Sequence, residues 1–148
     1  MDIKTVQIGN KLWMAENLAY DDGGDGITYN PENKEYYYTW DTTKRVANKL
    51  GWMIPSEEDW NKACEECGGI KDNEGDYNNC SLKEKLNIKL AGYYCNDFYN
   101  VGSNGHFWSS FEGFISTAWH RDFDSNSLVT RNYDIENYRL SVRLMKEK

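Results

Sequence analysis

Alternating hydrophobic and polar positions open the chain and predict a β-hairpin over residues 5–14. Val6 and Ile8 alternate with polar neighbours, and Gly9 followed by Asn10 is typical of a two-residue hairpin turn. The same alternation returns many times towards the C-terminus, where it predicts a β-rich region. The remaining strand-like segments are residues 36–40, 91–94, 107–110, 116–120, 128–130 and 140–144.

Hydrophobic positions with helical spacing predict two helices between these strands. In the first, Val46, Ala47 and Leu50 keep helical spacing. We expect Asp41 or Thr42 to cap this helix and Gly51 to end it.

The second helix is expected from about Glu57 to Cys67, and its start is a clear local signal. The Ser56 hydroxyl can accept from the backbone of Asp59, whose carboxylate can bond back, which approximates a capping box. Polar loops are expected over residues 21–26 and 71–80, and a short helix or turn over residues 82–90.

A hairpin, two helices and then several strands with long loops predict an α+β fold. In this arrangement the helices flank a mainly antiparallel sheet. The chain contains no internal repeat and no low-complexity linker, so we expect one domain over residues 1–148.

The composition narrows the classes of partner. A net charge of −7 without a basic cluster argues against nucleic-acid binding, which needs a basic face. The sequence has no apolar run of membrane-spanning length and no signal-peptide pattern, so no membrane insertion is expected. Aromatic residues reach 15 %, and such an excess can fill a core or form a contact surface.

The cysteines leave three states open. An even count permits two disulfides in three connectivities, while free thiols and a four-thiolate zinc site are the alternatives. The residues concerned are Cys64, Cys67, Cys80 and Cys95.

Seven short segments follow one another in a characteristic order. They are residues 5–20, 38–40, 51–56 with Trp60, 90–93, 107–110, 118–119 and 141–143. Together they resemble the Fibrobacter succinogenes major paralogous domain, a bacterial module whose fold is similar to C-type lectins. The resemblance implies paired N- and C-terminal strands and a loop-rich region that displays a ligand surface, but it implies little about chemistry.

The chain departs from the family pattern at one pair of positions. Members often carry a cysteine before the Gly-Trp step and another at the end of Ser-Val-Arg-Cys, where this chain has residues around Leu50 and Leu144. Losing that cross-link costs about 2–4 kcal/mol unless packing of the two leucines offsets it. Members are often exported or on the cell surface, while the missing disulfide also allows the cytoplasm, so the location stays open.

Calcium-dependent sugar binding is not expected, because the chain lacks the Glu-Pro-Asn or Gln-Pro-Asp loop of sugar-binding C-type lectins. Asp21, Asp25, Gly26 and Glu32 match parts of a twelve-residue calcium loop, but an acidic solvated loop is the favoured interpretation. We assign no cofactor and no metal ligand.

A hydrolase that uses His106 or His120 is an alternative function. Ser109 and Ser110 lie near His106 in the chain, but they lack a nucleophile-elbow motif. We therefore assign no catalytic residue and expect no enzyme activity.

Residues 119–138 are the best candidate for a functional surface, because aromatic and arginine anchors alternate there with adaptable Asn, Ser and Asp. We predict a non-catalytic module that binds a protein or a glycan through C-terminal loops. A structural module of a surface protein, with all aromatic residues in the core, is a further alternative. The predicted ligand-binding residues are Trp119, Arg121, Phe123, Asn126, Arg131, Asn132, Tyr133 and Tyr138.

The resemblance also implies a more specific hypothesis. Some lectin-fold proteins are targets of diversity-generating retroelements, which vary C-terminal positions rich in Asn, Tyr, Asp and Ser. The positions that fit this bias are Asn126, Asn132, Tyr133, Asp134, Asn137 and Tyr138. Neither the ligand nor the oligomeric state follows from these features.

Overall fold

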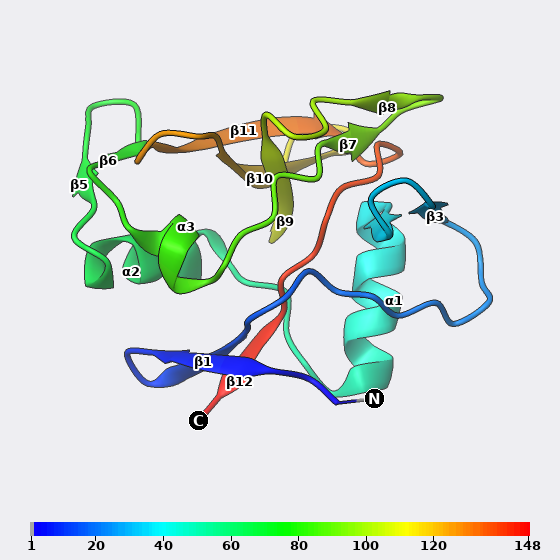
Figure 1. The fold of residues 1–148 in the computed structure, drawn as a ribbon, viewed down its shortest axis with the longest axis horizontal. Coiled ribbons are helices and arrows are strands. Elements are labelled where there is room, and N and C mark those ends of the chain that lie inside the picture. The colour runs from blue at the N-terminus through cyan, green and yellow to red at the C-terminus, as the bar shows by residue number, and fades with distance from the viewer. Residues whose placement is uncertain (1) are drawn as a thin grey trace.

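Two main helices and a set of antiparallel sheets form the α+β fold in the computed structural model, which describes residues 2–148 (Figure 1). The coarse fold class predicted from the sequence is therefore confirmed. In Figure 1 the terminal strands lie at the bottom, the helices stand in the middle, and the strands of the C-terminal half lie across the top.

The two ends of the chain pair in one sheet, as expected. β1 (Thr5–Ile8) and β2 (Lys11–Met14) form the predicted hairpin, and β12 (Met145–Glu147) adds to the other edge of β2 in the order β1-β2-β12. This sheet closes the lower side of the domain.

The prediction of a strand over residues 140–144 is wrong, because the last strand begins only at Met145. Residues 140–144 are all buried, and their backbone groups bond to several separate partners. Leu140 bridges to Tyr38, whereas Ser141 bridges to Phe107. The segment is hydrophobic because it threads through the core, not because it lies along a neighbouring strand.

A second hairpin leads into the first helix. β3 (Ile27–Asn30) pairs with β4 (Glu35–Tyr38), and α1 (Trp40–Leu50) follows at once. Neither Asp41 nor Thr42 caps this helix; the cap is Thr39, whose side chain accepts from the Thr42 backbone N at 3.2 Å. The cap lies earlier in the chain than predicted, because the helix begins almost directly after β4.

The end of α1 and the start of α2 agree with the sequence. Gly51 follows α1 with φ of 73°, a left-handed conformation that glycine adopts without strain. In α2 (Glu57–Glu66) the Ser56 side chain accepts from Asp59 N at 3.0 Å, and the Asp59 carboxylate accepts from Ser56 N at 2.9 Å. The approximate capping box is thus a complete one.

The largest sheet has the order β5-β6-β11-β10-β9. Its first two strands are β5 (Ile70–Lys71) and β6 (Tyr77–Asn78). They occupy Lys71 and residues 77–78 of the segment 71–80, which we expected to be a polar loop. Its main strands are β9 (Gly105–Glu112), β10 (Thr117–Phe123) and β11 (Val129–Ile135). The short helix α3 (Leu82–Lys85) and the hairpin of β7 (Tyr93–Tyr94) and β8 (Phe98–Tyr99) precede them.

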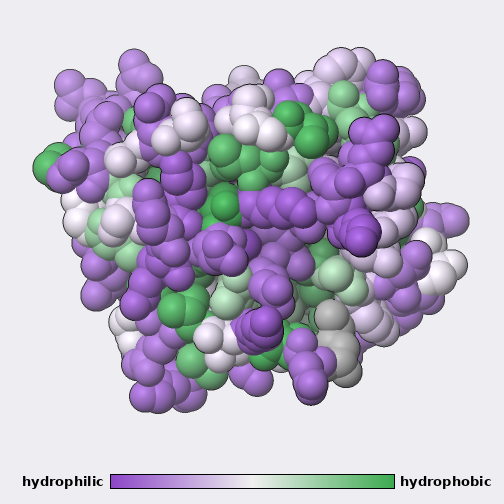
Figure 2. All heavy atoms as spheres, viewed as in Figure 1, coloured by the Kyte–Doolittle hydropathy of each residue, from purple (hydrophilic) through white to green (hydrophobic). Residues whose placement is uncertain are grey.

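Two hydrophobic clusters hold these layers together. One is centred on Trp60, whose ring lies 4.9 Å from that of Trp13 and also contacts Phe107 and Phe123. The other contains Leu144, with Leu50 packed against its edge. Leu50 and Leu144, the two positions considered for a missing cross-link, therefore pack in the same cluster. The surface in Figure 2 is mostly hydrophilic, with separate groups of hydrophobic side chains between polar ones.

Candidate functional site

The predicted binding segment is a β-hairpin and not a set of loops. β10 and β11 pair in register from Thr117 opposite Ile135 to Phe123 opposite Val129. Successive side chains of a strand point to opposite faces, so the odd-numbered residues of both strands share one face and the even-numbered residues share the other. The segment thus presents two separate surfaces.

Arg121 and Phe123 are not at the surface, which corrects two of the predicted ligand-binding residues. Each is 1 % exposed. The Phe123 ring packs 6.1 Å from that of Trp60, and Arg121 donates to the Asn61 side chain at 2.9 Å. Both belong to the half of the odd-numbered face that α2 covers, so their burial follows from the position of that helix.

Two arginines converge on one carboxylate beside α2. Arg131 pairs with Glu57 at 3.0 Å, and Arg121 pairs with the same oxygen at 3.4 Å. Arg131 also places its guanidinium 4.1 Å from the centre of the Trp119 ring. It therefore links the covered half of the face to the uncovered half.

Beyond α2 the same face carries exposed aromatic and aliphatic side chains, which we call the aromatic patch. The Trp119 ring lies 5.0 Å from Tyr133 and 6.5 Å from Phe111, measured between ring centres. At the β9–β10 turn, Phe114 and Ile115 are 82 % and 77 % exposed. The patch consists of Phe111, Phe114, Ile115, Trp119, Tyr133 and Ile135, with Arg131 at its border.

Only three of the eight predicted residues lie in or beside the aromatic patch: Trp119, Arg131 and Tyr133. Asn126 is exposed in the turn at the far end of the hairpin. Asn132 faces the opposite side and donates to Asp122 at 2.7 Å. Tyr138 follows β11 and stacks on Tyr93 with 5.7 Å between ring centres.

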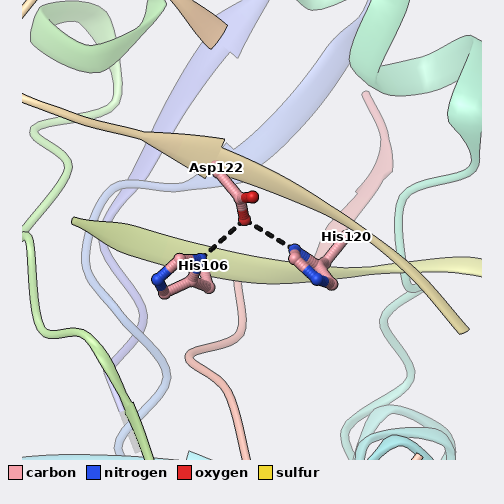
Figure 3. Close-up of side chains that lie close together, drawn as sticks. All are labelled: His106, His120 and Asp122. Carbon is pink, nitrogen blue, oxygen red and sulfur yellow. Dashed lines mark hydrogen bonds and ion pairs between the residues drawn. The ribbon is translucent and has the colours of Figure 1, made fainter. Parts of the chain in front are cut away.

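A hydrogen-bonded cluster of two histidines and an aspartate occupies the even-numbered face (Figure 3). Nδ1 of His106 and Nδ1 of His120 lie 2.7 Å and 2.6 Å from the same oxygen, Oδ1 of Asp122. His106 comes from β9 directly opposite Asp122, and His120 lies two residues before Asp122 on β10. At its other nitrogen His120 contacts the Asp134 carboxylate at 2.8 Å.

The acids around His120 control its charge. Burial alone would lower the pKa of His120, but hydrogen bonds to Asp122 and Asp134 outweigh burial and raise that pKa to about 9. Burial would raise the pKa of Asp122, but hydrogen bonds from His106 and His120 bring it to about 2. At neutral pH the cluster therefore contains a protonated His120 between two carboxylates.

The hydrolase alternative needs a nucleophile beside one of these rings. Both histidines have acid partners, as an enzyme would require. No serine, threonine or cysteine side chain in residues 2–148 hydrogen-bonds to either ring. Ser109 is buried, and its hydroxyl oxygen has no hydrogen-bond partner within the described part of the chain.

The other sequence candidates have structural settings. All four cysteines are free thiols, and Cys80 donates to the carbonyl of Cys64 at 3.6 Å between buried parts of the chain. In the acidic loop, Asp22 pairs with Arg45 and Lys49, each at 2.8 Å. Across the described residues, the one grouping of potential metal ligands is His106, His120 and Asp122.

The sequence did not predict the hydrogen bond between His106 and Asp122. It also did not point to four residues of the aromatic patch: Phe111, Phe114, Ile115 and Ile135. The signal available was positional: His120, Asp122 and Asp134 are all even-numbered in one hairpin. If residues 119–138 had been predicted as strands, the alternation of side chains between the two faces would have placed these three residues on the face opposite to that of Trp119 and Tyr133.

Comparison of the chain with protein-family models, with curated proteins and with solved structures found no match. No helix within residues 2–148 has the length and apolar character needed to cross a membrane. The aromatic patch and the histidine–aspartate cluster are therefore the features that bear on function.

Proposed function

We propose that this chain is a non-catalytic binding module with a C-type-lectin-like fold, of the kind found in the Fibrobacter succinogenes major paralogous domain, and that it recognises a protein through the aromatic patch. The observation that carries the proposal is the group of rings centred on the half-buried Trp119, which packs against the exposed rings of Phe111 and Tyr133.

The fold part of the proposal is supported by where the resembling residues lie. Trp13, Trp40, Trp60 and Trp108 are all buried, so the segments that resemble the family form the scaffold. The arginine of the Ser-Val-Arg segment, Arg143, is 1 % exposed and donates to the carbonyls of Met14, Leu86 and Asn87. It ties the C-terminal segment to two other parts of the chain.

The chemistry of the patch favours a protein over a glycan. Rings stack on sugars, but Ile115 and Ile135 offer only apolar contact, which suits the apolar core of a protein–protein interface. Phe114 at 82 % exposure is an anchor of the kind that inserts into a partner's pocket. Open grooves of about 750 and 560 Å³ lie elsewhere, beside Pro31 and beside Trp52, so neither includes this surface.

The test is a comparison of three immobilised proteins. The patch variant carries Phe114→Ser, Ile115→Ser and Tyr133→Ser. The control variant carries Tyr29→Ser, Ile70→Ser and Val101→Ser, which remove hydrophobic side chains of 45–63 % exposure outside the patch. Proteins retained from a lysate of the source cells are identified, and a retained candidate is then purified and titrated against all three.

A purified partner that binds the wild type and the control variant, but binds the patch variant at least ten-fold more weakly, is expected. A loss of about 1–2 kcal/mol for each anchor would produce that change. Equal binding to all three proteins would overturn the proposal. Loss of a wild-type dimer in the patch variant would make the partner a second copy of the chain, and selective loss of binding on a glycan array would replace the protein partner by a glycan.

A further inference from the structure

We infer that His106, His120 and Asp122 form a binding site for one divalent transition metal, with zinc as the favoured ion. This site is separate from the proposed protein-binding surface, because it lies on the even-numbered face of the same strands. The geometry points to it through three features: convergent ligand atoms, an outer ring of partners and a partly open side.

The ligand atoms already converge. Nδ1 of His106, Nδ1 of His120 and Oδ1 of Asp122 lie within 4.8 Å of one another, and Figure 3 shows the two rings aimed at the carboxylate from either side. In a tetrahedral zinc site, bonds of about 2.0–2.1 Å separate neighbouring ligand atoms by about 3.3 Å. The nitrogen–oxygen separations of 2.7 Å and 2.6 Å would need to widen by about 0.6–0.7 Å, and the two ring nitrogens, which lie within 4.8 Å of each other, would settle at about the same 3.3 Å.

Each ligand has a second contact that holds it in place. His120 faces Asp134 at 2.8 Å through Nε2, which matches the carboxylate–histidine–metal arrangement common around zinc. Asn132 donates to the other oxygen of Asp122 at 2.7 Å. The Asn100 amide nitrogen lies 3.3 Å from Nε2 of His106, and rotation of that amide by about 180° would turn its oxygen towards the Nε2 proton of a metal-bound ring. The three candidate ligands thus have outer contacts on the sides that face away from the proposed ion.

The charges suit a doubly positive ion. Zinc would bind each ring through a deprotonated Nδ1 while Nε2 keeps a proton. The Nδ1 proton of a ring that carries two protons would leave to solvent, and that of a ring that carries one would move to Nε2. The carboxylates of Asp122 and Asp134 would then balance the charge of the ion. Two imidazoles and one carboxylate favour zinc and similar ions over calcium or magnesium, which prefer oxygen ligands.

The ligands stand on paired strands, so the site is rigid. Asp122 lies directly opposite His106 in the β9–β10 register, and His120 points to the same face two residues away. The His106 and Asp122 side chains keep 11 % and 12 % exposure, so the cluster is not fully closed to solvent. Three protein ligands with an open fourth position distinguish this arrangement from a closed structural zinc site.

The decisive experiment uses the unmodified, tag-free protein, because it contains two histidines in all. After treatment with a chelator, the protein is titrated with zinc chloride while the ring nitrogens are observed by long-range ¹H–¹⁵N NMR. Both Nδ1 resonances are expected to change together and to stop changing at one equivalent of zinc. No change at either ring, or a change at only one, would overturn the three-ligand site.

Variants test a ligand and an outer contact by calorimetry of zinc binding. His106→Gln should weaken zinc binding by about 100-fold or more, and Asp134→Asn by about 10–100-fold. Glu58→Gln, which removes the same charge from an exposed position on α2, should leave the affinity unchanged. Equal affinity in all these proteins would contradict the assignment.

Cobalt distinguishes this site from one made by the cysteines. Cobalt chloride bound at His106, His120 and Asp122 is expected to give visible absorption without a thiolate-to-metal charge-transfer band. A charge-transfer band would place the ion on free thiols such as Cys67 and Cys80, and would overturn the proposal.

Discussion

The odd-numbered residues of β10 and β11 meet α2 at one end and solvent at the other, whereas the even-numbered residues support a hydrogen-bonded polar cluster. Phe123 and Trp119 lie four residues apart on the odd-numbered face, yet the first is a core residue and the second borders the exposed patch. On the opposite face, His120 is 2 % exposed and bonded at both nitrogens.

This contrast shows that residue type alone does not determine the role of a position in the hairpin. Aromatic and arginine residues serve both the core and the surface on the odd-numbered face, and the edge of α2 separates the two. The paired arginines illustrate this: Arg121 and Arg131 are cross-strand neighbours with the same acid partner, Glu57, but only Arg131 reaches the surface.

The largest expected effect is the difference between Phe123→Ala and Tyr133→Ala. Removing the buried Phe123 ring should lower the free energy of unfolding by about 3–5 kcal/mol, because it leaves a cavity beside Trp60. Tyr133 is 58 % exposed, so its replacement should cost about 1 kcal/mol or less. Urea unfolding of both variants measures the difference, and similar costs would show that α2 does not divide the face in this way.

A smaller difference is expected between the two arginines. Arg121→Ala should cost about 3 kcal/mol, because it removes one of the two cations beside the partly buried Glu57 and leaves a hole under α2. Arg131→Ala should cost about 1 kcal/mol, since its 30 % exposed side chain is screened by water.

Replacement of Arg121 by methionine separates packing from charge. Arg121→Met keeps most of the side-chain volume, so a cost well below that of Arg121→Ala would assign the difference to packing. Urea unfolding compares all three arginine variants. If Arg131→Ala costs as much as Arg121→Ala, the assignment of the two positions to core and surface is contradicted.

The elements set by local interactions could be predicted from the sequence. The first hairpin follows from alternation and the turn at Gly9 and Asn10, and the start of α2 follows from the bonds between Ser56 and Asp59. These signals involve residues within a few positions of one another, so they depend little on contacts with distant parts of the chain.

The parts of the site that depend on distant contacts could not be predicted. Whether Phe123 is buried depends on α2, which precedes it by more than fifty residues in the chain. The meeting of His106 with Asp122 depends on the register of β9 against β10, which shifts between Ala118 and His120. Alternation shows which residues share a face within one strand, but the register between strands decides which of them meet.

The six positions compatible with a diversity-generating retroelement show the same limit. Tyr133 lies in the aromatic patch, whereas Asn132 and Asp134 lie on the opposite face and bond to Asp122 and His120. As a set these positions do not form one continuous surface, although they are close in the sequence.

The smallest expected effect concerns Glu136, which follows β11 near the end of the even-numbered face. Burial, together with a hydrogen bond to Glu112 and the nearby charge of Asp41, raises the pKa of Glu136 to about 7, and Lys44 opposes this shift.

A glutamate with a raised pKa in the folded protein binds its proton more tightly there than in the unfolded chain. Its contribution to stability is therefore complete below its ordinary pKa of 4.5 and is lost as the pH rises to about 7. Because Glu136 is partly exposed and its charge is screened by solvent, the loss should be below about 1 kcal/mol. Glu136→Gln cannot lose a proton, so its urea midpoint should fall less than that of the wild type between about pH 5 and pH 8. Glu58→Gln, in the exposed first turn of α2, should keep the wild-type pH dependence. If Glu136→Gln also keeps it, then Glu112 and Glu136 do not share a proton.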